Sequence, residues 1–282
     1  MSEDTILKRL VGQILTTGYH LLGANRAMRI GRISIFYKMF HKLAGFGLAD
    51  ASGAFLFDVK GHKMYIPADN IGFFMAPAYE PETTAVFLSL ITDGDVVVDL
   101  GAHVGYYTLL AARRVGPEGR VFAFEPNPDN FRLLVKNIDL NFYSNVIPVQ
   151  KAVSNETGEA ELFLQGGATH SLFRKSENSN KSVLVQTTSL DEYFQTIEQR
   201  LRSRITLIKM DIEGAELQAA LGMRRIIREN AEIAIISEFE PENLKASGTD
   251  PSEFKSYLTG QGFKLRGVGK NLLCLKTRKP DL

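Results

Sequence analysis

Residues 96–108 read Val-Val-Val-Asp-Leu-Gly-Ala-His-Val-Gly-Tyr-Tyr-Thr. An apolar run that ends in Asp99 and passes through a glycine turn into a helical pattern is typical of the first strand, turn and helix of an open parallel sheet. The two glycines give the order Asp-x-Gly-x-x-x-Gly, so the Gly-x-Gly-x-x-Gly fingerprint of dinucleotide enzymes is not met. No Gly-Lys-Ser/Thr follows, which argues against a phosphate-binding P-loop.

The polar residues of this stretch indicate the kind of ligand. Asp99 places a carboxylate where a phosphate would be repelled and an ammonium or sulfonium would be attracted. Glu125 ends the next apolar run, at a position suited to accept both hydroxyls of an unphosphorylated ribose. Gly101 and Gly105 are expected to let a ligand approach the backbone. A cationic amino-acid group and a free ribose together describe S-adenosylmethionine; the alternative is that both carboxylates only cap helices.

Apolar runs alternate with helical patterns from residue 96 onward, which predicts an α/β fold with a doubly wound, mostly parallel sheet. The last two runs, Lys264–Val268 and Leu272–Lys276, are separated by too few residues for a parallel crossover. One edge strand should therefore be antiparallel. Cys274 lies in this closing pair, and a single cysteine excludes an internal disulfide framework.

Two further segments precede the alternating pattern. Strand-like runs around a Gly61-His62 turn predict a β-hairpin at the start of a domain spanning residues 51–282. Residues 1–50 form a separate basic arm, with seven Lys/Arg against two acidic residues among the first 49. Apolar spacing predicts two amphipathic helices in this arm.

The arm has two interpretations. Residues 5–45 lie on an anionic membrane surface or cover an acidic substrate, or they pack on the domain with their basic residues in solvent. No apolar run is long enough to span a bilayer. The overall formal charge of +1 argues against nucleic acid as a partner. A single cysteine favours a reducing compartment, so a cytoplasmic protein, peripheral to the membrane in the first case, is expected.

Several segments, taken in order, resemble the FkbM family of class I methyltransferases. They are Tyr79-Glu80-Pro81-Glu82, residues 97–108, Phe124-Glu125-Pro126, Ala152-Val153-Ser154, Thr188-Ser189-Leu190-Asp191 and residues 208–216. The resemblance implies a seven-stranded sheet, S-adenosylmethionine as donor, and O-methylation of a hydroxyl on a sugar, glycolipid or polyketide-like small molecule. His103 departs from the pattern, because the family usually has Asn there. The donor-binding positions carried over are Glu80, Thr83, Asp99, Gly101, His103, Gly105, Tyr106, Thr108, Glu125, Pro126, Ala152 and Asp211.

Methyl transfer to an alcohol also needs a group that removes a proton. Asp211 and Glu213 follow the fourth core strand and are candidates for base and orienter, and Glu238 ends the fifth strand at the same edge. Asp211 and Glu213 could instead share a divalent cation, but no third dedicated ligand is evident and no metal is assigned. Glu213, with Glu216, could also only stabilise the first turn of the next helix.

His170 is the remaining catalytic candidate. It lies in a Gly-rich segment, residues 166–172, that is expected to be a loop between two paired strands and to close over the acceptor. Histidine titrates near neutral pH, which suits proton transfer.

A different class of function is a noncatalytic, membrane-associated module that keeps the methyltransferase fold. Methylation of nucleic acid is disfavoured, because the segment after the fourth strand is acidic and lacks an aromatic stacking platform.

Overall fold

The computed structural model describes residues 53–68, 70, 79–164, 170–173, 181–195 and 199–276. The helical arm predicted for residues 1–50 lies outside these residues. The chain divides into two compact units, one of Met1–Pro81 with Lys136–Phe142 and one of Glu82–Val135 with Tyr143–Leu282. Each unit is described by itself.

The first unit contains the predicted hairpin. Strands β1 (Ala54–Val59) and β2 (His62–Pro67) pair antiparallel. The turn falls one residue earlier than predicted, at Lys60 and Gly61, whose φ angles of 53° and 78° are both positive, as a two-residue turn between right-twisted strands requires.

A side chain of the same unit caps the outer edge of β2. Asn137 accepts a hydrogen bond from the backbone N–H of Tyr65 at 2.7 Å and donates to its carbonyl at 3.1 Å. Because its two amide atoms replace a neighbouring strand, this edge is not left with unsatisfied backbone groups.

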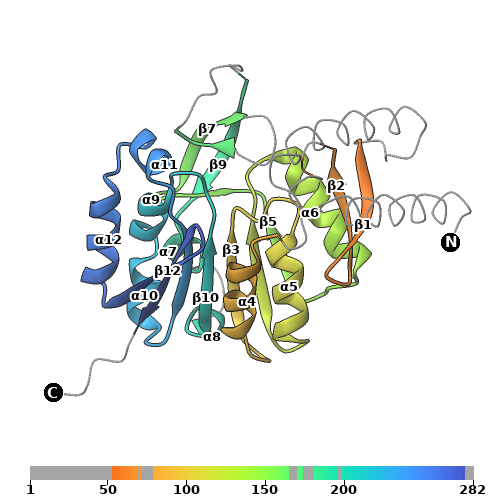
Figure 1. Cartoon of the computed structure of the whole chain (residues 1–282), viewed down its shortest axis with the longest axis horizontal. Coiled ribbons are helices and arrows are strands. Elements are labelled where there is room, and N and C mark those ends of the chain that lie inside the picture. Colours follow the sequence, from red (N-terminus) through yellow and green to blue (C-terminus); the bar gives the residue numbers. More distant parts are fainter. Residues whose placement is uncertain are drawn as a thin grey trace, which may run out of the picture. The chain divides into compact units, whose positions relative to one another are not determined.

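The second unit is built on the seven-stranded sheet that was predicted (Figure 1). Five adjacent strands, from β11 to the edge strand β5, are parallel, whereas β13 is antiparallel to both of its neighbours. The antiparallel edge is therefore confirmed as a hairpin, with β12 outermost and β13 inside it. In spatial order the strands are β12 (Phe263–Val268), β13 (Asn271–Lys276), β11 (Ala234–Glu238), β10 (Ile205–Met210), β3 (Val96–Leu100), β4 (Arg120–Phe124) and β5 (Val146–Val149).

The strand order reverses between β3 and β10. From β3 the chain continues to β4 and β5 on one side, and β10 and β11 are added on the other. In open parallel sheets the ligand crevice lies at such a switch point, beyond the carboxyl ends of the strands. The residues that follow β3, β4, β10 and β11 are therefore the candidates for a site.

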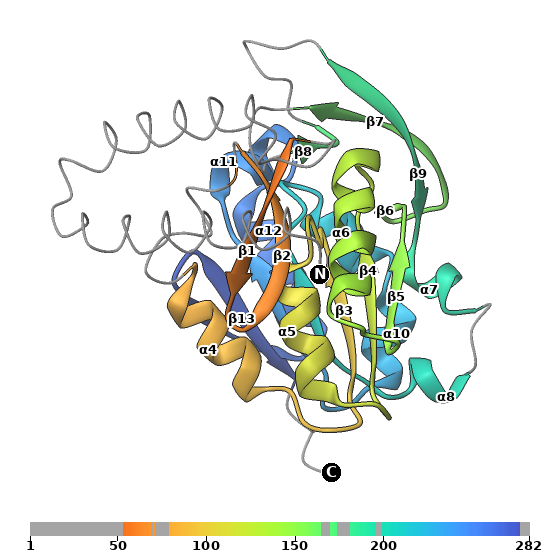
Figure 2. The ribbon, with the colours of Figure 1, turned by 90° about the vertical axis from the view of Figure 1, so that its right-hand side faces the viewer.

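Helices cover both faces of this sheet. Helices α4 and α5 lie on one face, whereas α9, α10 and α12 lie on the other (Figure 2). None of the helices in the described part of the chain has the length and hydropathy needed to cross a bilayer. The helices are α4 (Pro81–Ser89), α5 (Tyr106–Val115), α6 (Pro128–Leu140), α7 (Leu190–Tyr193), α8 (Gln199–Arg202), α9 (Glu216–Leu221), α10 (Arg224–Glu229), α11 (Pro241–Ala246) and α12 (Pro251–Gly260).

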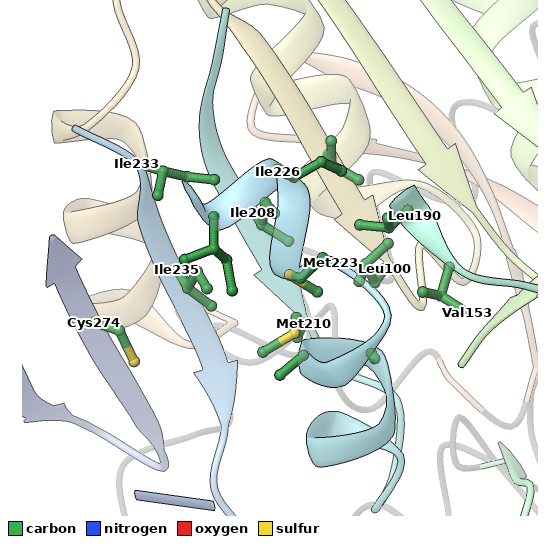
Figure 3. Packing of buried hydrophobic residues seen from close by; sticks show 14 of the residues in the cluster. Leu100, Val153, Leu190, Ile208, Met210, Met223, Ile226, Ile233, Ile235 and Cys274 are labelled. Carbon is green, nitrogen blue, oxygen red and sulfur yellow. The ribbon is translucent and has the colours of Figure 1, made fainter. Parts of the chain in front are cut away.

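An extensive hydrophobic cluster lies on the second face (Figure 3). Strand residues such as Ile208 and Ile235 pack there against Met223 and Ile226. Cys274 of β13 is part of this cluster, and burial raises the pKa of its thiol to about 12. It therefore stays protonated and acts as a small apolar side chain.

A single helix was expected after residue 215, but the structure has two, α9 and α10. The interruption falls at Gly222, where a Cβ atom would overlap the carbonyl oxygen of Ser154. The close approach of this distant backbone explains both the glycine and the break, and no local pattern reports it.

A second, four-stranded sheet belongs to the same unit. The predicted pairing of residues 159–164 with 183–187 is confirmed, because β7 pairs antiparallel with β9. The expectation that His170 lies in a loop is corrected, since it lies in a short strand, β8, paired with β7. The strands, in spatial order, are β6 (Ala152–Val153), β9 (Ser182–Thr188), β7 (Gly158–Leu164) and β8 (His170–Ser171).

Gly101, directly after β3, makes the closest backbone contact at the switch point. Its φ is +79°, and a Cβ atom on it would overlap the carbonyl oxygen of Asp211 after β10. The absent side chain of this glycine is thus required by the protein's own backbone, and the approach of a ligand to Gly101 stays a prediction. Gly105, with φ +101°, precedes α5, and a Cβ there would lie 2.9 Å from Leu134 Cδ1.

The variant Gly101→Ala tests this contact. We expect its free energy of unfolding to fall by about 3 kcal/mol or more, because a left-handed Ala costs about 1–2 kcal/mol and the overlap adds about 1–3 kcal/mol. Gly248→Ala is the matched control, since Gly248 also has φ +79° but a Cβ there would have no atom within 4 Å. Urea denaturation measures both variants, and equal losses would contradict the tight contact.

Candidate active site

Asp99, the fourth residue of β3, is buried and tied to the adjacent helix. The hydroxyl of Thr108 in α5 donates a hydrogen bond to Asp99 Oδ2 at 2.6 Å. Burial raises the pKa of Asp99 to about 6, while the Thr108 hydrogen bond and the charge of Lys209 act in the opposite direction. Asp99 and Thr108, which are both predicted to bind the methyl donor, are thus also hydrogen-bonded to each other.

Glu125 follows β4, with both carboxylate oxygens held by backbone amides. Oε2 accepts from the N–H of His103 at 2.8 Å and Oε1 from the N–H of Asn127 at 2.9 Å. Burial raises the pKa of Glu125 to about 7, although these amide hydrogen bonds lower it. The carboxylate is therefore fixed beside the turn that follows β3.

His103 lies in that turn with a positive φ of 51°. This left-handed region is one that Asn and His adopt more readily than most residues, which gives a backbone reason for either at this position. Burial, followed by the charge of His170, lowers the pKa of His103 to about 4. Its imidazole is therefore neutral at physiological pH.

The other predicted donor positions are distributed more widely. Tyr106 is buried, with its hydroxyl 3.2 Å from Thr84 Oγ1 of α4. Ala152 packs with apolar residues of the second sheet, and Glu80 belongs to the first unit. Pro126 directly follows Glu125 and is partly buried. The structure thus gathers Asp99, Gly101, His103, Gly105, Thr108 and Glu125 around the turn after β3.

Three of the predicted catalytic carboxylates meet at the neighbouring strand ends. Asp211 directly follows β10, Glu213 lies in the loop to α9, and Glu238 is the last residue of β11. One oxygen of each lies within 4.8 Å of one oxygen of each of the others. The predicted juxtaposition of these side chains is therefore present, and their chemical roles stay predictions.

Glu213 is held by two elements that the sequence did not connect to it. Its Oε2 accepts a hydrogen bond from Asn243 Nδ2 of α11 at 2.6 Å, and its carbonyl accepts one from Ser171 Oγ of β8 at 2.8 Å. Its φ of 52° is left-handed, an uncommon conformation for a glutamate that these contacts support.

Glu216 has a structural role in the same loop. Its Oε1 accepts hydrogen bonds from the backbone N–H groups of Ile212 and Gly214, both at 3.3 Å. Burial raises its pKa to about 7. This residue satisfies amides at the start of α9, which matches the alternative that the sequence left open for it.

The pKa of Glu238 is raised well above that of a free carboxyl. Burial, followed by the charges of Asp211 and Glu213, raises its pKa to about 10. Within the described residues its Oε2 has no hydrogen-bond partner. A carboxyl that keeps its proton donates a hydrogen bond and does not accept a proton. Glu238 is therefore better suited to be a hydrogen-bond donor than a general base.

The cluster also bears on the question of a metal. The sequence offered no evident third ligand beside Asp211 and Glu213, and the structure places Glu238 there. Carboxylate oxygens are the ligands that Mg²⁺ prefers, but ligation would require Glu238 to lose its proton. A carboxyl that holds its proton is a poor ligand for a divalent cation, so no metal is assigned to this cluster.

His170 reaches the same region from the second sheet. Ser171, next to it in β8, bonds to Glu213, and the charge of His170 contributes to the lowered pKa of His103. These two observations place His170 and Ser171 near the carboxylate cluster. Residues 166–169 lie outside the described part of the chain, and closure of this segment over the acceptor stays a prediction.

Sequence reasoning missed Lys209, which lies near the end of β10 and is completely buried. Its ammonium is 3.0 Å from Asp211 Oδ2 and 3.4 Å from Asn271 Oδ1. The available signal was a single lysine in the otherwise apolar end of a core strand, where a charge requires a partner. Asn243 and Asn271 carried no comparable signal.

The chain is similar to several known proteins. It is 27% identical to the hexuronic acid methyltransferase AglP of Haloferax volcanii over 53% of this chain and 58% of that protein, so it spans less than two thirds of that relative. It is 24% identical to methyltransferase sdnD of Sordaria araneosa over 71% of this chain and 88% of that protein. Among solved structures, an S-adenosylmethionine-dependent methyltransferase from Aquifex aeolicus has a TM-score of 0.41 and 15% identity, over 69% of this chain and 87% of that one.

A family model decides the assignment. The model described as the methyltransferase FkbM domain matches residues 99–265, which is more than half of the chain and contains the carboxylates described above other than Glu80. The chain therefore belongs to the FkbM methyltransferase family.

Proposed function

We propose that this protein transfers a methyl group from S-adenosylmethionine to a hydroxyl group of a small molecule, with a sugar or a sugar-containing lipid as the favoured acceptor. The observation that carries the proposal is the meeting, at one switch point, of a fixed carboxylate suited to ribose and a carboxylate cluster suited to an alcohol. Glu125 is the carboxylate suited to ribose, and the cluster suited to an alcohol consists of Asp211, Glu213 and Glu238.

The residues of the first group fit the donor. Each oxygen of Glu125 accepts one backbone hydrogen bond, and because a carboxylate has about four lone-pair sites, it retains capacity for ribose hydroxyls. Asp99 and Asp211 add negative charge near the turn after β3, which favours a cationic amino-acid group. His103 is neutral and adds no repelling charge.

The second group fits the chemistry. When bound, S-adenosylmethionine supplies a methyl group whose bond to sulfur breaks, with the electron pair left on sulfur, as the acceptor oxygen bonds to its carbon. Asp211, whose side chain is 26% exposed, is the group we propose to take the hydroxyl proton. Glu238 donates a hydrogen bond that orients the acceptor, and Glu213 holds a second hydroxyl. Alignment by such fixed groups contributes several kcal/mol, on the order of 7–11 in favourable cases.

The charge of the cluster bears on the acceptor atom. A hexuronic acid, named for the relative from Haloferax volcanii, offers both hydroxyls and a carboxylate. Two acidic side chains beside a protonated third would repel an anionic acceptor group. We therefore propose a hydroxyl as the methylated position.

Calorimetry with S-adenosylhomocysteine tests the donor site. We expect wild-type protein to bind it, and the double variant Asp99→Ala with Glu125→Ala to bind at least about 100-fold more weakly, because the charge of Asp99 and the direct hydrogen bonds of Glu125 contribute about 1.4 kcal/mol or more each. Glu242→Ala, at an exposed position of α11, is the control and should bind as wild type. Absence of binding by the wild type, or undiminished binding by the double variant, would contradict the proposal.

The raised pKa of Glu125 gives a pH dependence. With a pKa of about 7, its ionised fraction rises between pH 6 and pH 8, and only the ionised form accepts hydrogen bonds at both oxygens. The dissociation constant of S-adenosylhomocysteine should fall about tenfold over this interval. In Glu125→Gln, binding should be weaker, and this pH dependence should be lost. Equal affinity of the wild type at both pH values would be the contrary result.

The chemical stability of the product tests the methylated position. With p-nitrophenyl glucoside and p-nitrophenyl glucuronide as acceptors and a methyl-labelled donor, we expect label that survives mild alkali, because methyl ethers are stable and methyl esters are hydrolysed. Label released by alkali would contradict transfer to a hydroxyl. Label in neither acceptor would contradict a sugar of this kind as the substrate.

A further inference from the structure

Lys209 is a charge in an unusual position. Its side chain is fully buried within β10, and in the sheet it pairs in register with Asp99 of β3. Register partners on parallel strands point to the same face, as do residues two apart on one strand. Lys209 and Asp99 therefore share the face covered by α4 and α5, and Lys209 reaches Asp211, directly after β10, through its ammonium.

The ammonium of Lys209 is held by groups from three elements. It donates to Asp211 Oδ2 at 3.0 Å and to Asn271 Oδ1 of β13 at 3.4 Å. It also lies 5.1 Å from the ring centre of Tyr107 in α5, within the range of a cation–π contact. Burying an ammonium without such partners would cost several kcal/mol, on the order of the effective penalty for a single ion.

The contacts continue beyond Lys209. Asn271 donates through Nδ2 to Thr83 Oγ1 of α4 at 3.1 Å. A connected path thus runs from α4 through β13 to Lys209 and ends on one oxygen of Asp211. In the described part of the chain Asp211 Oδ1 receives no comparable hydrogen bond, and the side chain is partly exposed.

We propose that Lys209 is a positioning residue for methyl transfer: it holds Asp211 Oδ2 from inside the sheet and so presents Asp211 Oδ1 to the acceptor hydroxyl. Its own ammonium touches neither donor nor acceptor. The proposal rests on the proposed function and adds to it the residue that fixes the orientation of the base.

The geometry gives a physical reason for this arrangement. A carboxylate at a strand end can rotate about its side-chain bonds, and a displacement of about 1 Å at a reacting group costs about 100-fold in rate. Lys209 reaches Asp211 along the strand, and Asn271 limits where the ammonium can lie. The lysine therefore removes freedom from Asp211 without occupying the crevice.

Steady-state kinetics of four proteins test the proposal: wild type, Lys209→Met, Asp211→Asn and the double variant, with a methyl-labelled donor and p-nitrophenyl glucoside. We expect Lys209→Met to lower kcat about 100-fold and to change the KM for the donor by less than about threefold. Because Lys209 acts through Asp211, the double variant should be no slower than Asp211→Asn within about threefold. Lys264→Met, an exposed lysine of β12, is the control and should retain wild-type kcat.

A purely structural role for Lys209 predicts a different result. The two substitutions would then lower kcat independently, and their effects would multiply in the double variant, which would overturn the proposal. Undiminished kcat in Lys209→Met would overturn it as well. Wild-type protein that neither binds S-adenosylhomocysteine nor transfers methyl would instead overturn the proposed function, and the assignment of Lys209 with it.

Asn271→Ala keeps the test decisive if Lys209→Met does not fold, as S-adenosylhomocysteine binding will show. This variant removes the second acceptor of the ammonium and leaves every charge in place. We expect kcat to fall about tenfold with the donor KM unchanged, since a loosened ammonium orients Asp211 less well. An unchanged kcat would overturn the path through Asn271 and with it the proposed restraint on Lys209.

Discussion

The close contact between Gly101 and the carbonyl of Asp211 is the constraint on which the site depends. It brings the turn after β3 against the loop after β10. The backbone N–H of Asp211 donates to Leu100 O at 3.0 Å, and the N–H of Gly101 donates to Phe124 O at 3.0 Å. The hydrogen bonds of three strands thus continue past the strand ends. The loop after β10 is hydrogen-bonded to β3, and the other turn begins directly after β3. The residues proposed to bind the methyl donor and those proposed to bind the acceptor are therefore held at a fixed distance from one another.

The raised pKa values of the buried carboxyl groups limit the electrostatic cost of placing several of them close together in the site. Asp99, Glu125, Glu216 and Glu238 all have pKa values raised by burial. A buried carboxyl avoids the full penalty of a charge by keeping its proton, and a neighbouring anion strengthens that tendency. Glu238 shows the effect most strongly, because the charges of Asp211, Glu213 and Glu216 raise its pKa further, and the charge of Lys209 opposes them less. The acidic composition of the crevice therefore overstates its negative charge at neutral pH.

Local patterns predicted the parts of this structure that depend on neighbours in sequence. Alternating runs predicted the sheet and its antiparallel edge, and the positions of Glu125 and Asp211 at strand ends followed from the same reading. Contacts between residues far apart in the sequence could not be predicted from these local patterns. The partner of Gly101 lies after another strand, the partner of Lys209 in β13 is 62 residues away, and the break at Gly222 depends on Ser154. Periodicity reports which face of an element is buried, but not which distant backbone approaches it.

The difference between Asp99 and Glu125 shows how one acidic crevice can treat two parts of a ligand differently. Asp99 accepts a short hydrogen bond from a buried hydroxyl, so on the proposed function its effect on a cation comes mainly from its field, which acts without contact where the dielectric is low. Glu125 accepts hydrogen bonds from two backbone amides and from the side chain of Asn130, and it retains lone-pair capacity for direct contact. On the proposed function, the cationic group of the donor would thus be attracted by charge at a distance, and its ribose would be bound by direct hydrogen bonds.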